Sequence, residues 1–218
     1  MPIPSQGPSL DPISVLVRPR LEGDLVAIVA LAERVYPLSI HVPEAVWPEE
    51  SLREHMHRFP EGQLVALDGQ GKLLGDSTSL RVPLDAALAP HTWAHITGRG
   101  RLTTHDPSGD ALYGVDIMVE PALQGRGIGA QLYLARIALG HRLGCRAFVA
   151  GARIPGYHLV ANRLSPEAYV AEVAAGHRFD PTLSRQLRQG FEVRGLLPNY
   201  FRDPESMDQA VLIFLPLD

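Results

Sequence analysis

Apolar and polar positions in the first part of the chain recur with periods that predict a β-helix-helix-β-β order of elements. A short β-branched run over 13–18 predicts a strand, which Pro19 ends. Apolar residues at three- and four-residue spacing predict a helix over 25–35, and the carboxylate of Asp24 is the expected cap of its first turn. The further elements expected here are a second helix over 48–59 and strands over 63–67 and 72–82, joined as a hairpin.

Prolines and glycines then break the pattern over 83–109, which we expect to be a long irregular insertion. A second irregular insertion is expected at about 153–180. The remaining expected elements are strands over 112–119, 147–150, 191–194 and 210–215, and helices over 125–143, 166–176 and 180–189. We expect a flexible N-terminal tail over 1–11. Because no repeat or linker divides the rest of the chain, we expect a single domain over 12–218.

Composition excludes several classes of protein. The 218 residues are 45% hydrophobic and 20% charged, which is enough apolar surface for a folded core. A net charge of −4 without runs of like charge argues against a nucleic-acid partner, and no uncharged apolar run is long enough to cross a membrane. Cys145 stands alone, which fits a reducing compartment, and the N-terminus lacks the pattern of a signal peptide. We therefore expect a cytoplasmic protein, and the scattered histidines predict no metal site.

A strand, a glycine-rich turn and a helix meet at 115–130, and this segment carries the candidate chemistry. Gly125, Gly127 and Gly129 place no side chain over the backbone, so consecutive amides at a helix N-terminus can face an anion. The positive end of the helix dipole favours the same anion. The segment predicts a phosphate site, and the alternative is a tight turn without a ligand.

Two other phosphate motifs fit the spacing less well. Gly125, Gly127 and Ala130 satisfy the minimal dinucleotide fingerprint, but five residues separate the strand from the first glycine. The next strand also ends near Arg153 instead of an acidic residue, so an NADP-linked oxidoreductase that uses Arg153 as a phosphate contact is the weaker alternative. A Walker loop is excluded because no Gly-Lys-Ser/Thr follows.

The spacing Gln124-x-x-Gly127-x-Gly129 resembles the pyrophosphate-binding motif of the GNAT acetyltransferase superfamily, Gln/Arg-x-x-Gly-x-Gly/Ala. The order of elements is similar to that of this family over nearly the whole chain. The runs 112–117, 153–158 and 197–200 resemble a less-studied branch that sometimes occurs fused to a nitrilase-like amidase domain. The resemblance implies an α/β (α+β) fold, with a mixed, mostly antiparallel central sheet flanked by helices on both faces.

The same resemblance implies acetyl-CoA (coenzyme A) as the co-substrate. One set of residues would pair with the pantetheine arm and polarise the thioester carbonyl: Ile117, Met118 and Val119. Another set would hold the pyrophosphate: Gln124, Gly125, Arg126, Gly127, Ile128, Gly129 and Ala130. Homodimerisation is common in the family and is expected here on that ground alone.

In the family an amine attacks the thioester directly, so a carboxylate is needed to take the ammonium proton. Asp116 and Glu120 are the nearest acids to the expected thioester contact. The alternative for Asp116 is that neighbouring backbone or side-chain groups satisfy its carboxylate in the strand. The alternative for Glu120 is that it faces solvent or interacts with the positive N-terminus of the helix. Arg153, Tyr157 and His158 lie where substrate-binding groups would be expected, and the alternative is a plain surface loop.

Many family members place a tyrosine four residues before the Gly-Phe pair of the late helix, where it protonates the departing thiolate, but here that position is Gln186. An amide has no proton to give near neutral pH. Tyr200 and Tyr157 are the candidate replacements, and the favoured alternative is that the thiolate leaves unaided, because a thiol has a pKa near 8.5.

These observations predict an N-acetyltransferase that acetylates an amine of a small molecule or peptide in a ternary complex. A non-catalytic acyl-CoA-binding or sensor domain is the alternative from another class.

Overall fold

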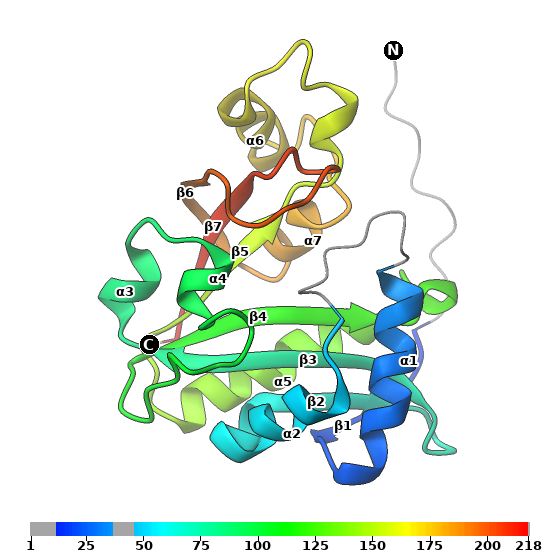
Figure 1. Ribbon diagram of the computed structural model, residues 1–218. Helices are drawn as coiled ribbons and strands as arrows, with labels where there is room; N and C mark the ends of the chain where they lie inside the picture. The colour runs from blue at the N-terminus through cyan, green and yellow to red at the C-terminus, as the bar shows by residue number, and fades with distance from the viewer. Residues whose placement is uncertain (1–11, 37–45, 218) are drawn as a thin grey trace.

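The computed structural model describes residues 12–36 and 46–217, and one seven-stranded sheet runs through it in the order β1-β2-β3-β4-β5-β7-β6 (Figure 1). Its strands are β1 (Leu16–Pro19), β2 (Gln63–Leu67), β3 (Leu73–Val82), β4 (Ala111–Val119), β5 (Ala147–Arg153), β6 (Glu192–Leu197) and β7 (Ala210–Pro216). Neighbouring strands are antiparallel except for β4 and β5, which are parallel. The predicted mixed, mostly antiparallel sheet is confirmed.

The helices cover both faces of this sheet. They are α1 (Leu25–Val35), α2 (Glu49–Arg58), α3 (Leu84–Leu88), α4 (Trp93–Ile96), α5 (Ile128–Arg142), α6 (Pro166–Ala174) and α7 (Leu183–Leu187). The prediction for the cap of α1 is wrong: Asp24 makes no capping bond to that helix. Its carboxylate instead pairs with Arg18 at 2.6 Å and accepts the Leu21 N–H at 2.7 Å, because a short 3-10 turn precedes α1.

Alternate residues of β2 show how the two faces are separated. Val65 and Leu67 pack with α1 in one apolar cluster, whereas Leu64 and Ala66 pack with the start of α5 in another. Successive side chains of a strand point to opposite faces, so α1 and α5 lie on opposite sides of the sheet, as Figure 1 also shows. These two sides are called the α1 face and the α5 face below.

The segment expected to be an irregular insertion over 83–109 contains two short helices, α3 and α4. The Thr92 side chain caps α4 by accepting the N–H of His95. Four residues of this segment, Gly98, Arg99, Gly100 and Leu102, have positive φ, which explains why no helical period was visible. The predicted flexible tail over 1–11 lies outside the described residues.

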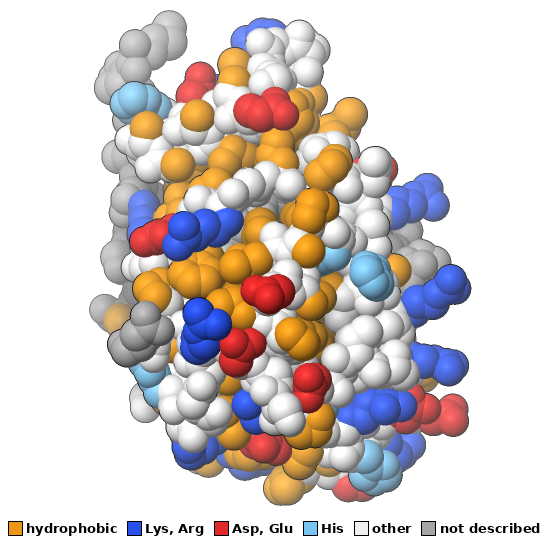
Figure 2. Space-filling model, turned by 90° about the vertical axis from the view of Figure 1, so that its left-hand side faces the viewer, with side chains coloured by type: hydrophobic (Ala, Val, Ile, Leu, Met, Phe, Trp, Pro, Cys, Tyr) orange, Lys and Arg blue, Asp and Glu red, His pale blue; other side chains and the backbone are white. Residues whose placement is uncertain are grey.

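On the face that Figure 2 shows, acidic and basic side chains are interspersed among apolar ones. No helix in the described part of the chain is long and apolar enough to span a membrane. Cys145 is buried.

Candidate active site

The sheet opens between β4 and β5. The two strands pair from Ala111 with Ala147 to Gly114 with Ala150, and this last pair is the apex of the opening. Beyond the apex lies a cleft of about 1940 Å³. It is lined by the ends of both strands, the start of α5, the end of α1, α4, α7 and the segment that follows β6.

A β-bulge in β4 sets which side chains reach the cleft. Ser79 pairs with Gly114 and Thr78 pairs with Asp116, so Val115 is an extra residue in β4. The Val115 carbonyl accepts the Trp93 indole N–H at 3.3 Å. Because a bulge interrupts the alternation of side chains, Asp116 lies on the α1 face together with its neighbour Val115.

The predicted phosphate loop lies at the N-terminus of α5. Gly125 and Gly127 have φ of 80° and 83°, and Gly127 is the residue directly before the helix. A Cβ at Gly125 would meet nothing within 4 Å, so the backbone conformation and not packing requires glycine there. The α5 N-terminus therefore offers free amides and a positive dipole end to the cleft.

Most of the predicted cofactor residues line the cleft: Ile117, Val119, Gln124, Gly125, Gly127, Ile128, Gly129 and Ala130. The side chain of Met118 is buried in the α1-face cluster instead, as the alternation along β4 requires. Arg126 lies in the loop beside them, and its carbonyl accepts the Ile13 N–H at 3.1 Å.

Asp116 provides a carboxyl group inside the cleft. Its Oδ1 accepts the Tyr36 hydroxyl at 2.6 Å, and its Oδ2 is buried without a hydrogen-bond partner among the described residues. Burial raises the pKa of Asp116 to about 6, with a further increase from the nearby charge of Asp76, while the Tyr36 hydrogen bond opposes both. A carboxyl group with this pKa is ionised at neutral pH and able to accept a proton.

Glu120 lies elsewhere. Its carboxylate pairs with Arg34 of α1 at 2.8 Å, and its side chain is 16% exposed. Glu120 does not line the cleft in the described structure. The structure therefore brings only Asp116 of the two predicted bases to the opening between β4 and β5.

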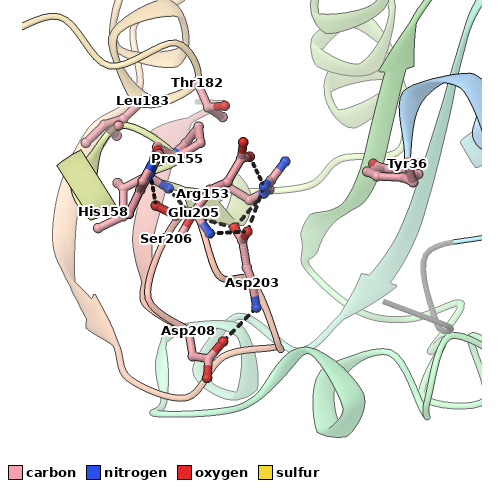
Figure 3. Close-up of polar contacts among 12 residues, drawn as sticks. Tyr36, Arg153, Pro155, His158, Thr182, Leu183, Asp203, Glu205, Ser206 and Asp208 are labelled. Carbon is pink, nitrogen blue, oxygen red and sulfur yellow. Dashed lines mark hydrogen bonds and ion pairs between the residues drawn. The ribbon is translucent and has the colours of Figure 1, made fainter. Parts of the chain in front are cut away.

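Of the three predicted substrate contacts, Arg153 lines the cleft (Figure 3). Its guanidinium binds Asp203 through two hydrogen bonds, of 2.7 and 2.8 Å, and binds Glu205 at 3.0 Å. These carboxylates hold the pKa of Arg153 above its usual value although burial opposes the shift. In Figure 3 Tyr36 lies across from this cluster, which carries two carboxylates against one cation.

The other two predicted contacts, Tyr157 and His158, are not among the described residues that line the cleft. The Tyr157 hydroxyl donates to the Leu164 carbonyl at 3.1 Å. The His158 ring Nδ1 lies 2.8 Å from the Pro155 carbonyl, and its side chain is exposed. Both residues therefore hold the turn after β5 in the described structure.

Tyr200 lines the cleft and begins a chain of hydrogen bonds on the α1 face. Its hydroxyl lies 2.8 Å from the Tyr113 hydroxyl, which lies 2.7 Å from Nε2 of His91. His91 Nδ1 lies 2.7 Å from the Ala89 carbonyl and must donate to it, so Nε2 accepts from Tyr113. Burial raises the pKa of Tyr200 well above its usual value, so the phenol is neutral.

Trp47 and Trp93, for which the sequence left open core packing or a place over the substrate groove, both line the cleft, whereas sequence reasoning missed Tyr36, Tyr133 and Arg136 there. Gln186 donates to the Tyr133 hydroxyl at 2.9 Å, and Tyr36 binds Asp116 across a separation of 80 residues. Only Arg136 left a signal in the sequence. It occupies one position of the otherwise apolar stripe of α5 that includes Ile128, Leu132 and Leu139.

Comparisons with known proteins agree with this architecture. A model of the acetyltransferase (GNAT) family matches residues 32–159. The chain is similar to the "Uncharacterized N-acetyltransferase YkwB" of Bacillus subtilis (strain 168), with 34% identity over 200 residues that cover 92% of this chain and 88% of the relative. It is also 39% identical over 157 residues to the "Probable hydrolase YhcX" of the same organism. That match covers 72% of this chain, which spans only 30% of the hydrolase's length.

Solved structures give the same result. The "GphF GNAT-like decarboxylase in complex with isobutyryl-CoA" matches with a TM-score of 0.77 and 26% identity, covering 93% of this chain and 100% of the other. The loading GNATL domain of CurA from Lyngbya majuscula matches with a TM-score of 0.73 and 21% identity, over 94% and 98% of the two chains, and shows the fold alone. Fold, cleft and glycine-rich loop thus define an acyltransferase-like class. Within that class, the chain belongs to the GNAT acetyltransferase family, as the sequence motif predicted.

Proposed function

We propose that this protein is an acetyl-CoA-dependent N-acetyltransferase that acts on an amine of a small molecule or peptide. The observation that carries the proposal is that the loop before α5 and the buried carboxyl of Asp116 line one cleft, on either side of the separated strands. The loop amides from Gln124 to Ala130 would bind the pyrophosphate of coenzyme A. The free edge of β4 at 117–119 would pair with the pantetheine arm and polarise the thioester carbonyl.

Asp116 is the proposed base. An ammonium group binds at Oδ2, which has no partner among the described residues, and transfers one proton to the carboxylate. The neutral nitrogen then attacks the thioester carbon, and the tetrahedral intermediate expels the coenzyme A thiolate, which takes its proton from water. Asp116 is the one acidic residue among the described residues that line the cleft, and its carboxylate favours a cationic acceptor at Oδ2.

Calorimetric titration with acetyl-CoA tests the donor site. We expect Gly127→Glu to abolish binding, because it places a carboxylate where the pyrophosphate would lie. Gly71→Glu is the matched control, since Gly71 also has positive φ, at 81°, and open space around its Cα but lies in the hairpin turn. Equal affinity of both variants for acetyl-CoA would reject the donor assignment.

Release of free thiol from acetyl-CoA in the presence of a panel of amines then tests catalysis. Amine-dependent thiol supports the enzyme, whereas binding without turnover supports the non-catalytic acyl-CoA-binding or sensor domain. Fluorescence-detected binding of NADPH without binding of acetyl-CoA would instead support the NADP-linked alternative.

A second candidate reaction is decarboxylation of an acyl-CoA, which the 26% identical GNAT-like decarboxylase favours. In that reaction the bond between a carboxylate and the α-carbon of the thioester breaks, CO₂ leaves, and the electron pair stays as an enolate that takes a proton from water. Release of CO₂ from malonyl-CoA without any amine distinguishes this reaction from acyl transfer.

A further inference from the structure

Arg136 is a buried cation at the cleft that no carboxylate neutralises. Its residue is 2% exposed, yet it lines the cleft, and within the described structure no carboxylate oxygen lies within 4 Å of its guanidinium. The other arginines that reach into the protein are paired: Arg20 binds Asp76, and Arg153 binds Asp203 and Glu205. Buried charges are normally paired, because removing a charge from water is costly.

The contacts of Arg136 are all to neutral groups. Its Nε donates to the Ser79 hydroxyl at 3.0 Å, and its Nη2 donates to the Thr78 carbonyl at 3.2 Å, beside the β4 bulge. The guanidinium lies 4.7 Å from the centre of the Phe148 ring. These contacts orient the guanidinium but leave its charge uncompensated. Burial lowers the pKa of Arg136, and the longer-range charges of Tyr133, Asp116 and Asp76 oppose this shift more weakly.

Gly114 makes room for this guanidinium at the apex. A Cβ on Gly114 would lie 2.6 Å from Nη2 of Arg136 and 3.1 Å from the Phe148 ring. Gly114 is also the last residue of β4 that pairs with β5. The cation is therefore seated where the two strands begin to separate.

Arg136 lies on the α5 face, the side on which the proposed donor enters. Ala130, Tyr133 and Arg136 line the cleft from one helix at three-residue spacing. Arg136 follows Gly127 by nine positions, which is about 14 Å along the helix axis. A donor that binds its phosphates at the start of α5 and extends to the apex ends with its acyl group beside Arg136.

We propose that Arg136 binds a carboxylate on the acyl group of the donor, so that the preferred donors are CoA thioesters of dicarboxylic acids. This inference rests on the coenzyme A site of the proposed function and makes acetyl-CoA the weaker of the donors that this site binds. The anion is assigned to the donor and not to the acceptor, because Arg136 lies on the α5 face with the loop before α5, whereas Asp116, the one acidic residue among the described cleft residues, lies on the α1 face. A guanidinium binds a carboxylate through paired hydrogen bonds, and the Nη1 of Arg136 has no partner among the described groups.

Calorimetric titration of the full chain with acetyl-CoA, malonyl-CoA and succinyl-CoA tests this inference. Succinyl-CoA is included because its carboxylate is not positioned to be lost as CO₂. We expect wild-type protein to bind at least one of the two dicarboxylic thioesters about a hundredfold more tightly than acetyl-CoA. Arg136→Gln should remove this preference while acetyl-CoA affinity changes by less than about threefold, and Arg136→Lys should restore part of the preference.

Ser79→Ala is the matched control, because it removes a contact that orients Arg136 but keeps the charge. A purely structural role predicts that Arg136→Gln weakens all three thioesters equally, and this result would overturn the inference. Wild-type protein that binds acetyl-CoA as tightly as the other two thioesters would also overturn it, even if Arg136→Gln does not fold. Wild-type protein that binds none of the three rejects the proposed function itself.

Discussion

Asp116 combines two properties that a base for amine acylation needs. One carboxylate oxygen accepts a hydrogen bond from the Tyr36 hydroxyl, and the other is buried and has no hydrogen-bond partner among the described residues. Burial raises the pKa of the group to about 6, high enough for useful proton affinity and low enough to keep the group ionised at neutral pH. The position beside the β4 bulge explains why the side chain reaches the α1 face of the opening.

We expect Asp116→Asn to lower kcat at least a hundredfold with acetyl-CoA affinity unchanged, because the amide cannot accept the ammonium proton. Glu120→Gln is the comparison, since Glu120 pairs with Arg34 outside the cleft, and its rate should stay within about threefold of wild type. Steady-state kinetics with calorimetry of donor binding provide both measurements. The opposite ranking of the two variants would move the base to Glu120.

The dependence of kcat/KM on pH gives a second test of the same base. The proposed base, Asp116, would work when deprotonated, so the rate should rise as pH increases through about 6, the pKa of Asp116. The Tyr36 hydroxyl lowers that pKa by donating to the carboxylate, so Tyr36→Phe should shift the rise to higher pH by about one unit. An unshifted profile in Tyr36→Phe would show that another group titrates.

Variants of two tyrosines, Tyr157 and Tyr200, test whether the departing thiolate needs a proton from the protein. Tyr157 donates to the Leu164 carbonyl and is not among the described residues that line the cleft, and Tyr200 is committed to the chain with Tyr113 and His91. We expect Tyr157→Phe and Tyr200→Phe each to retain turnover within about tenfold, because a thiolate can leave unaided and take a proton from water. A loss of a hundredfold or more in kcat for either variant, with donor affinity intact, would identify that tyrosine as the acid.

At the scale of elements, the sequence predicted the features that depend on residues close together in the chain. The spacing of apolar residues predicted α1, whose bounds match, and the hairpin of β2 and β3. The glycine loop before α5 was also visible, since its function depends on adjacent residues. Contacts between distant positions were not visible, because periodicity carries no information on register. Tyr36 reaches Asp116 across 80 residues, and Arg153 reaches Asp203 across 50.

The packing of Tyr200 over β5 offers a test at this scale. A Cβ on Gly151 would lie 2.3 Å from the Tyr200 ring, so Gly151→Ala must displace the ring and break its hydrogen bond to Tyr113. We expect the free energy of unfolding to fall by about 1–3 kcal/mol, as for other overpacked sites. Gly195→Ala in β6 is the matched control, because a Cβ there meets nothing within 4 Å. Its stability, measured by chemical denaturation, should stay within about 0.5 kcal/mol of wild type.

At the scale of the whole molecule, the opening of the sheet organises opposite charges on opposite faces. The α1 face presents Asp116, and the α5 face presents Arg136 and the amides at the start of α5. Both side chains are kept at the opening by features of β4, the bulge for Asp116 and Gly114 for Arg136. One strand therefore positions both groups, although no stretch of sequence contains both.

This arrangement has a cost in stability that pH measurements can reveal. The pKa of Asp116 is raised from 3.8 to about 6 in the folded protein, so between these values the folded state binds more protons than the unfolded state. The free energy of unfolding therefore falls as pH rises from about 4 to 6. Above that range it stays lower by up to about 3 kcal/mol than it would be if Asp116 had its usual pKa. We expect Asp116→Asn, although inactive, to unfold at higher denaturant concentration than wild type at about pH 8. The difference in unfolding free energy should shrink by about 2 kcal/mol at about pH 4.5, where the folded wild-type carboxyl is protonated. A stability difference that does not change between the two pH values would show that the pKa of Asp116 is not raised in the folded protein.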